Sequence, residues 1–212
     1  MQQYPYKKNR FVILAVLITG LLKFLFAEWL ELRVFYITAA CLFWIIFIFA
    51  RYKKNPLVLK RWGFQKHNFG KSLLYLLPFG LIFGAGIIIY ALFFTEAHYN
   101  WHILPILALY PLWGVIQQFI VAGLVAGNLK PLASGKMTDT QLNLLISFVF
   151  ALLHYPGILL MIYVFVMEFV FIKAYFKYNN LWSLGLYHGW VSGLFLFFVV
   201  ERDLWSELLQ IF

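Results

Sequence analysis

The sequence predicts an all-α protein, a polytopic bundle of about seven transmembrane helices that forms a single membrane domain over residues 1–212. Hydrophobic residues make up 64% of the chain and charged residues only 12%, with a mean hydropathy of +0.83. These values lie outside the range of soluble domains. Several apolar runs also reach the roughly 20 residues that a helix needs to cross a bilayer.

The apolar runs give the expected helices in order. Five of them are long enough for one span each, at residues 11–30, 34–50, 73–94, 103–127 and 181–200. The run at 141–176 would form a helix of about 54 Å, too long for one span of a core about 30 Å thick and slightly short for two. Because Pro156-Gly157 interrupts it, we expect two short spans or a broken, partly re-entrant hairpin.

The net charge of +9 reflects topology rather than nucleic-acid binding. With seven spans and a cytoplasmic N-terminus, the inner segments hold 14 of the 17 lysines and arginines. Only Arg33 and Arg202 fall in outer segments, and Lys23 lies within the first span, so every loop follows the positive-inside rule. We therefore expect contacts with membrane lipids and none with nucleic acid.

The two ends of the chain fit the same picture. The first apolar run is long, carries Lys23 and Glu28 and has no small-residue cleavage site, so we expect an uncleaved first span. We expect a multi-pass integral protein of a bacterial inner (plasma) membrane. At residues 202–212, apolar residues recur at helical spacing, which indicates a short interfacial helix.

Two histidines lie inside apolar segments near the end of the chain. His154 stands just before the Pro156 break and His188 about seven residues into the last span. Imidazole is costly to bury in hydrocarbon without a partner, so both residues indicate a functional site. Gln117 and Gln118, on the fourth predicted span at a comparable depth, are the candidate partners. We expect these four side chains to form one polar cavity.

The order of these residues resembles the CPBP or ABI family of intramembrane proteases, which includes the type 2 CAAX prenyl proteases. That family carries E-E-x-x-x-R on one span, F-x-x-x-H on the next and H-x-x-x-N/D on a later one. Phe150 and His154 match the second motif completely, and the run from Asn180 to His188 resembles the lead-in to the third. The resemblance covers roughly residues 103–200 and implies a CPBP-like core there.

The sequence departs from the family at its catalytic positions. Gln117-Gln118 stands in place of the two glutamates, Ala122 in place of the arginine and Ser192 in place of the asparagine. In the family, the first glutamate and a histidine are thought to activate water, while the last histidine and the asparagine hold the oxyanion. A neutral amide is no general base at physiological pH, so this mechanism cannot run unchanged.

Glu168 is the candidate replacement for the missing carboxylate. It lies about 12 Å from the end of its predicted span, close to the depth expected for His188. A carboxylate in hydrocarbon usually faces a partner or a cavity. Glu168 is either a surrogate base, a group that orients His188, or one member of a polar pair that fixes two helices. By resemblance, Phe150 and Ser192 are candidates for substrate binding.

The sequence indicates neither a metal nor another cofactor. His98 and His102 are spaced to share a helix face, but Glu96 is the only further ligand nearby, and Tyr99 and Trp101 favour an interfacial aromatic belt. His154 and His188 alone are too few for a zinc site.

The family resemblance leaves two functions open. The first is an intramembrane endopeptidase that acts on membrane-associated or lipidated peptides, with an altered or impaired catalytic motif. The second is a non-catalytic scaffold or binding protein of the same fold, whose partner is a membrane-associated protein. Two glycine pairs, Gly80 with Gly84 and Gly123 with Gly127, indicate close helix packing within the bundle.

Overall fold

The structure is a computed structural model that describes residues 10–94 and 100–209. All regular structure in these residues is helical, as predicted. Two segments, η1 and η2, have π-helical winding, and each continues directly from the α-helix before it. The elements are α1 (Arg10–Lys23), η1 (Phe24–Trp29), α2 (Arg33–Lys54), α3 (Val58–Trp62), α4 (Phe69–Phe94), α5 (Ile103–Gln118), η2 (Phe119–Ala126), α6 (Gly127–Ala133), α7 (Asp139–Leu152), α8 (Ile158–Tyr178), α9 (Leu181–Phe198) and α10 (Leu204–Leu209).

Six stretches of the described chain are long and apolar enough to cross a membrane, which makes this an integral membrane protein. They are Arg10–Trp29, Arg33–Lys54, Phe69–Phe94, Ile103–Ala133, Ile158–Tyr178 and Leu181–Phe198. The fourth continues beyond its predicted end at residue 127, because α5, η2 and α6 follow one another without a break. At 14 residues α7 reaches only about 21 Å, so a seventh span remains a prediction.

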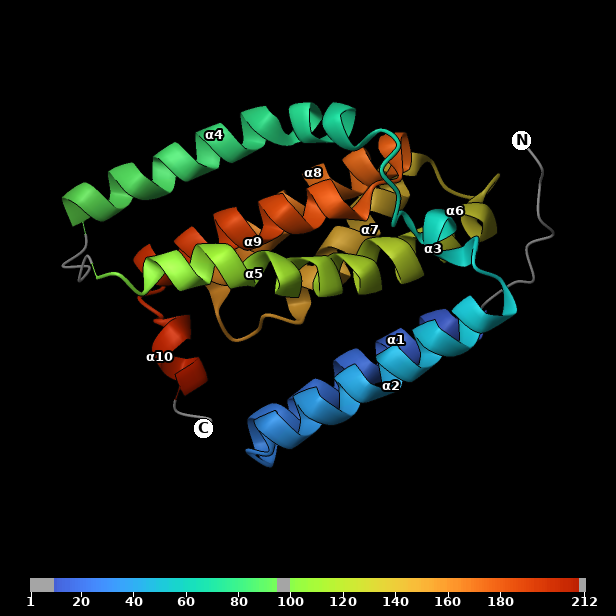
Figure 1. The fold of residues 1–212 in the computed structure, drawn as a ribbon, viewed down its shortest axis with the longest axis horizontal. Coiled ribbons are helices and arrows are strands. Elements are labelled where there is room, and N and C mark those ends of the chain that lie inside the picture. The colour runs from blue at the N-terminus through green and yellow to red at the C-terminus, as the bar shows by residue number, and fades with distance from the viewer. Residues whose placement is uncertain (1–9, 95–99, 210–212) are drawn as a thin grey trace.

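The bundle is built around α9. Its span is 78% buried inside the protein, whereas that of α2 is only 6% buried. In Figure 1, α5 and α8 lie beside α9, α4 covers one side, and the α1–α2 hairpin lies on the opposite side. Gly-rich sequence explains the central position of α9, since residues without a side chain let neighbouring backbones approach.

The predicted interruption near Pro156 is confirmed. α7 ends at Leu152 and α8 begins at Ile158, and the five residues between them form a tight corner with a cis Tyr155–Pro156 bond. At its other end, α7 starts with a capping box between Thr138 and Gln141, in which each side chain accepts the other's backbone N–H. His154 therefore lies directly after the C-terminal end of α7, a helix whose N-terminus is capped.

The C-terminal segment forms the short helix α10, within the predicted range 202–212. Residues 210–212 lie outside the described part of the chain. The carboxylate of Asp203 accepts hydrogen bonds from the backbone of Trp205 and Ser206 and so caps the helix. Its place at the membrane interface remains a prediction.

Membrane orientation is tested by cysteine labelling. In a Cys41→Ala background, cysteines at Lys54 and Lys136 are expected to be shielded from an impermeant reagent added outside intact cells. A cysteine at Tyr99, which lies outside the described residues, is expected to react. The ends of α2 and α6 lie at the same end of the bundle in Figure 1, as this orientation requires. Labelling at Lys54 or Lys136 would reverse or break the topology.

Candidate functional site

Gln118 links two other buried polar residues at the centre of the bundle. From the end of α5, its Nε2 donates one hydrogen bond to Oε2 of Glu168 on α8, at 2.7 Å, and lies 3.1 Å from Nδ1 of His188 on α9. Gln118 and Glu168 are fully buried, and His188 is 3% exposed. Three separate helices thus contribute to one polar cluster, which we call the Gln–Glu–His cluster.

The close approach of α5 and α9 brings His188 to Gln118. Two glycines flank His188, and an added Cβ would lie 2.2 Å from Cα of Pro111 at Gly189 and 2.2 Å from Cγ2 of Val115 at Gly185. Because these contacts leave no room for a side chain, the two backbones pack directly together. The imidazole therefore reaches an amide on the neighbouring helix.

The winding of the fourth span changes at this cluster. The π-helical segment η2 begins at Phe119, directly after Gln118. π-Helical turns are rare and often occur at functional sites, because they rotate the side chains that follow relative to an α-helix. The sequence contains no pattern that predicts this change.

Glu168 keeps one oxygen without a protein partner. Its Oε1 is buried and accepts no hydrogen bond from the described residues, and the same holds for the Oε1 atoms of Gln117 and Gln118. A buried polar atom without a partner costs about 1–3 kcal/mol. A group that is costly to bury and still lacks a partner is a candidate for contact with water or substrate.

Gln117 lies outside the hydrogen bonds of the Gln–Glu–His cluster. The sequence predicts that both glutamines share one cavity with His154 and His188, and in the structure it is Gln118 that contacts His188. Successive residues of a helix point about 100° apart, so only one of two adjacent glutamines can face His188. Gln117 is half-buried, and its Oε1 makes no hydrogen bond within the described chain.

His154 lies in the corner after α7, apart from the hydrogen bonds of the cluster. Its Nδ1–H donates to the carbonyl of Phe150 at 3.0 Å, and the edge of the imidazole meets the Phe150 ring, with centroids 5.0 Å apart. With Nδ1 occupied as a donor, the neutral ring offers Nε2 as an acceptor.

Ser192 has a buried partner, Tyr163, that was not among the residues predicted from the sequence. Its Oγ lies 3.0 Å from the hydroxyl of Tyr163 on α8 and 3.4 Å from Sδ of Met167. The Tyr163 ring stacks on Phe195, with centroids 4.0 Å apart. A tyrosine inside an apolar run needs a hydrogen-bond partner when buried, which is the signal that would have singled out Tyr163.

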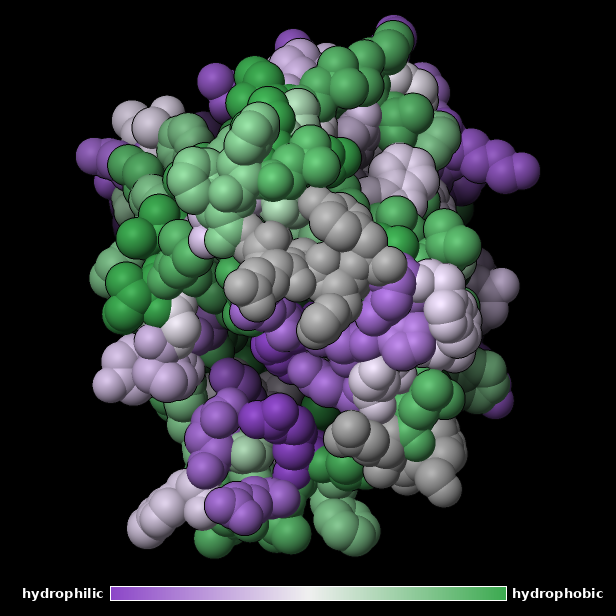
Figure 2. Space-filling view, turned by 90° about the vertical axis from the view of Figure 1, so that its left-hand side faces the viewer, coloured by the Kyte–Doolittle hydropathy of each residue, from purple (hydrophilic) through white to green (hydrophobic). Residues whose placement is uncertain are grey.

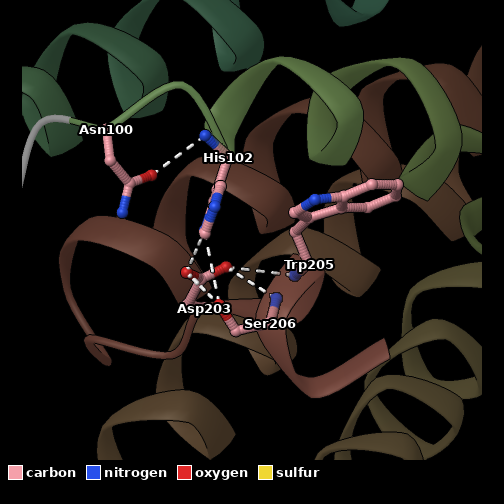
Figure 3. Close-up of polar contacts among 5 residues, drawn as sticks. All are labelled: Asn100, His102, Asp203, Trp205 and Ser206. Atoms are coloured by element: carbon pink, nitrogen blue, oxygen red, sulfur yellow. Dashed lines mark hydrogen bonds and ion pairs between the residues drawn. The ribbon is translucent and has the colours of Figure 1, made fainter. Parts of the chain in front are cut away.

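A second polar cluster lies at the end of the bundle where α10 meets α5 (Figure 3). Nδ1 of His102 lies 2.5 Å from Oδ2 of Asp203, and Oγ of Ser206 donates to the same oxygen at 2.8 Å. Burial raises the pKa of Asp203, but hydrogen bonds from His102 and Ser206 outweigh it and lower that pKa. In Figure 2, hydrophilic surface gathers in the middle and lower part of this end.

This arrangement is not that of a serine hydrolase. In a Ser-His-Asp triad the serine and the aspartate bind opposite nitrogens of the imidazole, whereas here both approach Nδ1. The cluster instead ties α10 to the start of α5. His98 and Glu96 lie outside the described residues, within which no group of three His, Cys, Asp or Glu side chains is arranged to hold a metal.

Comparison with known proteins supports the resemblance found in the sequence. Residues 99–194 match the family model described as type II CAAX prenyl endopeptidase Rce1-like. No curated protein and no solved structure gave a significant match. The matched region contains every residue of the Gln–Glu–His cluster as well as His154 and Ser192, while the elements from α1 to α4 precede it. The family resemblance is therefore confirmed.

Proposed function

We propose that this CPBP-like integral membrane protein, whose residues 99–194 match the type II CAAX prenyl endopeptidase Rce1-like family, is an intramembrane peptidase with Glu168 as its general base. One observation carries the proposal. Glu168 is held by Gln118 through one carboxylate oxygen, while the other oxygen is buried and receives no hydrogen bond from any residue that the structure describes. Gln117 and Gln118 stand where the family has its glutamates, so those positions no longer supply a carboxylate. Glu168 supplies a positioned carboxylate with one free oxygen in their place in this proposal.

The proposed reaction is hydrolysis of a peptide bond by water. Glu168 Oε1 accepts a proton from a water molecule while the water oxygen attacks the peptide carbonyl carbon. The carbonyl oxygen becomes an oxyanion, which His188 then stabilises. Collapse of this intermediate breaks the C–N bond, and protonated Glu168 returns its proton to the leaving amine. One water is consumed, and one carboxylic acid and one amine are formed, between which a proton then passes to give a carboxylate and an ammonium group.

Gln118 prepares both partners for these roles. Its two N–H groups point to Glu168 Oε2 and His188 Nδ1, so neutral His188 carries its proton on Nε2. That N–H is a donor for an oxyanion, the contribution that usually matters most in acyl transfer. A neutral amide is suited to this place because a second carboxylate would repel Glu168 and compete for its proton.

His154 and Ser192 complete the proposed site. His154 offers Nε2 as a second acceptor for the attacking water, the role that the family resemblance assigns to it. Ser192 lies one turn after His188, and the Ser192–Tyr163 pair supplies hydroxyl groups near the oxyanion. Phe150 fixes the His154 ring and lies on the substrate side of that histidine in this proposal.

The proposed substrate is a membrane-associated or lipidated peptide. A groove of about 570 Å³ opens between α6 and the end of α8, with both apolar and basic residues in its lining. Tyr175, which borders it, lies seven residues and therefore about 10 Å along α8 from Glu168. The lining also includes Asp139, whose carboxylate pairs with Lys130 at 2.7 Å, so the groove suits a peptide that has an apolar anchor and a polar end. Its lining includes Arg61, Lys130, Leu142, Tyr175, Phe176 and Asn179.

A non-catalytic scaffold is the second candidate. It is favoured by Gln117 and Gln118, which stand where the family has its glutamates. In that case the Gln–Glu–His cluster fastens α5, α8 and α9 together, as buried polar networks can. The partner would be a membrane protein that contacts the surface of the bundle.

His188→Ala distinguishes the two functions. If the protein is a peptidase, the purified wild type in lipid vesicles is expected to cleave members of a panel of membrane-tethered peptides. His188→Ala is expected to lower the rate about 10²–10³-fold, as loss of an oxyanion donor does. His102→Ala is the matched control, since it removes a histidine outside the proposed site. No cleavage by wild type, with a cellular phenotype that survives His188→Ala, would favour the scaffold.

A further inference from the structure

Lys23 joins the N-terminal hairpin to the corner that holds His154. It is the last residue of α1, and its Nζ donates a hydrogen bond to the carbonyl oxygen of Leu153 at 2.8 Å. Leu153 is the C-cap residue of α7 and directly precedes His154. The two residues are 130 positions apart in sequence, and Lys23 lies outside the region that matches the family.

The Lys23 ammonium is held in place from its own side of the contact. Oε1 of Glu28 lies 3.2 Å from its Nζ, and Oε2 of the same carboxylate lies 3.7 Å from Arg33. Tyr36 on α2 donates a hydrogen bond to the backbone carbonyl of Thr19 on α1. These contacts join α1, η1 and α2 to one another close to Lys23.

The backbone of α1 lies directly against the same corner. A Cβ added at Gly20, one turn before Lys23, would lie 3.1 Å from Cδ2 of Leu153. Gly20 thus admits the Leu153 side chain while Lys23 binds the Leu153 carbonyl. Two residues of α1 therefore contact Leu153 independently. The packing of α1 against the corner does not depend on the Lys23 side chain alone.

The corner determines the position of the His154 imidazole. The N–H of His154 donates to the carbonyl of Ala151, and its own carbonyl accepts from Gly157. Its Nδ1 is bound to Phe150. The carbonyl of Leu153 lies at a helix C-terminus, where backbone oxygens lack helical partners and a cation is stabilising. Lys23 supplies that cation.

We infer that Lys23 is a positioning residue, which holds the Leu153 carbonyl and thereby fixes the imidazole of His154 in the peptidase site. The expected effect of Lys23 on hydrolysis rests on the proposed function. The expected effect of Lys23 on the position of His154 does not depend on that function. Lys23 gives the N-terminal hairpin a specific role, because the hairpin supplies the cation that binds the C-terminal end of α7.

The test measures both His154 and hydrolysis in the full-length protein. Lys23→Met removes the ammonium, Lys23→Arg keeps a cationic donor, and Lys53→Met is the matched control on exposed α2. His154 reactivity is followed by site-resolved mass spectrometry after treatment with diethyl pyrocarbonate. Lys23→Met is expected to raise the modification rate of His154 several-fold and to lower kcat on the order of ten- to hundredfold with KM nearly unchanged. Lys23→Arg and Lys53→Met are expected to resemble wild type.

Equal His154 reactivity in wild type and Lys23→Met would overturn the inference, whether or not hydrolysis is observed. If the wild type cleaves no peptide while Lys23→Met still exposes His154, the positioning role stands and the proposed function fails. Glu28→Gln gives a second measurement if Lys23→Met does not fold. It removes the carboxylate that pairs with the Lys23 ammonium but leaves the Lys23 side chain itself in place. A smaller rise in His154 reactivity is then expected, and no rise would also overturn the inference.

Discussion

Glu168→Gln is expected to abolish peptide hydrolysis while leaving the bundle intact. The new amide has almost the same shape as the carboxylate, and its oxygen can still accept the hydrogen bond from Gln118. It cannot take a proton from water, so the rate is expected to fall about 10²–10⁴-fold, the usual contribution of a general base. Initial rates on a cleaved peptide in vesicles provide the measurement.

The control for this substitution is Glu207→Gln. Glu207 pairs with Arg202 at the end of the bundle, at 2.6 Å, and has no part in the proposed site. Its loss is expected to change hydrolysis less than twofold, since exposed ion pairs contribute about 0–1 kcal/mol to stability and Glu207 donates nothing to the reaction. The thermal midpoint of Glu168→Gln in detergent is expected to equal or exceed that of wild type, because a buried charge is removed. Full hydrolysis by Glu168→Gln would exclude Glu168 as the base.

Gly189→Ala is expected to destabilise the protein strongly. The added Cβ would lie 2.2 Å from Cα and 2.3 Å from N of Pro111, and backbone atoms cannot rotate away as a side chain can. α5 and α9 must therefore separate, at a cost of about 1–3 kcal/mol or more. The same movement draws His188 away from Gln118, so hydrolysis is expected to fall together with the thermal midpoint.

Gly84→Ala is the matched control for Gly189→Ala. Gly84 is also a helix-interior glycine, on α4, but nothing lies within 4 Å of a Cβ added there. The substitution is expected to leave the thermal midpoint unchanged or slightly raised, since alanine favours a helix over glycine by up to about 1 kcal/mol. Equal behaviour of the two variants would contradict the close approach of α5 and α9.

The sequence predicted the class of fold, while the roles of the candidate site residues remain predictions. Long apolar runs identify the spans because only helices or closed barrels satisfy the backbone inside lipid. Depth along the spans also placed Glu168 near His188, and the structure connects the two through Gln118. Depth is measured along a helix axis and follows directly from counting residues, which explains this success.

Rotation about the helix axis was not predictable in the same way. The choice between Gln117 and Gln118 depends on which side of α5 meets α9, and the flanking glycines decide it. Gly185 and Gly189 have the same spacing as the glycine pairs singled out from the sequence, yet their packing is far closer than that at Gly84. Apolar helices show little amphipathic pattern, so the sequence does not mark the packed face.

Contacts between distant segments were beyond the sequence altogether. Lys23 was recognised as a cation inside the first span, but its partner is a backbone carbonyl 130 residues away. A carbonyl carries no side-chain signature. The Tyr163–Ser192 pair likewise joins two helices through hydroxyl groups that each occur in an apolar run.

Glu168-dependent hydrolysis is tested most directly in ¹⁸O-labelled water, with the purified, full-length protein in lipid vesicles. Wild type is expected to cut a membrane-tethered peptide, and the new C-terminal carboxylate is expected to carry one ¹⁸O atom, seen by mass spectrometry. No such product is expected from Glu168→Gln in the same assay. Absence of a labelled product from folded wild-type protein across the peptide panel, or an equal yield from Glu168→Gln, would contradict Glu168-dependent hydrolysis.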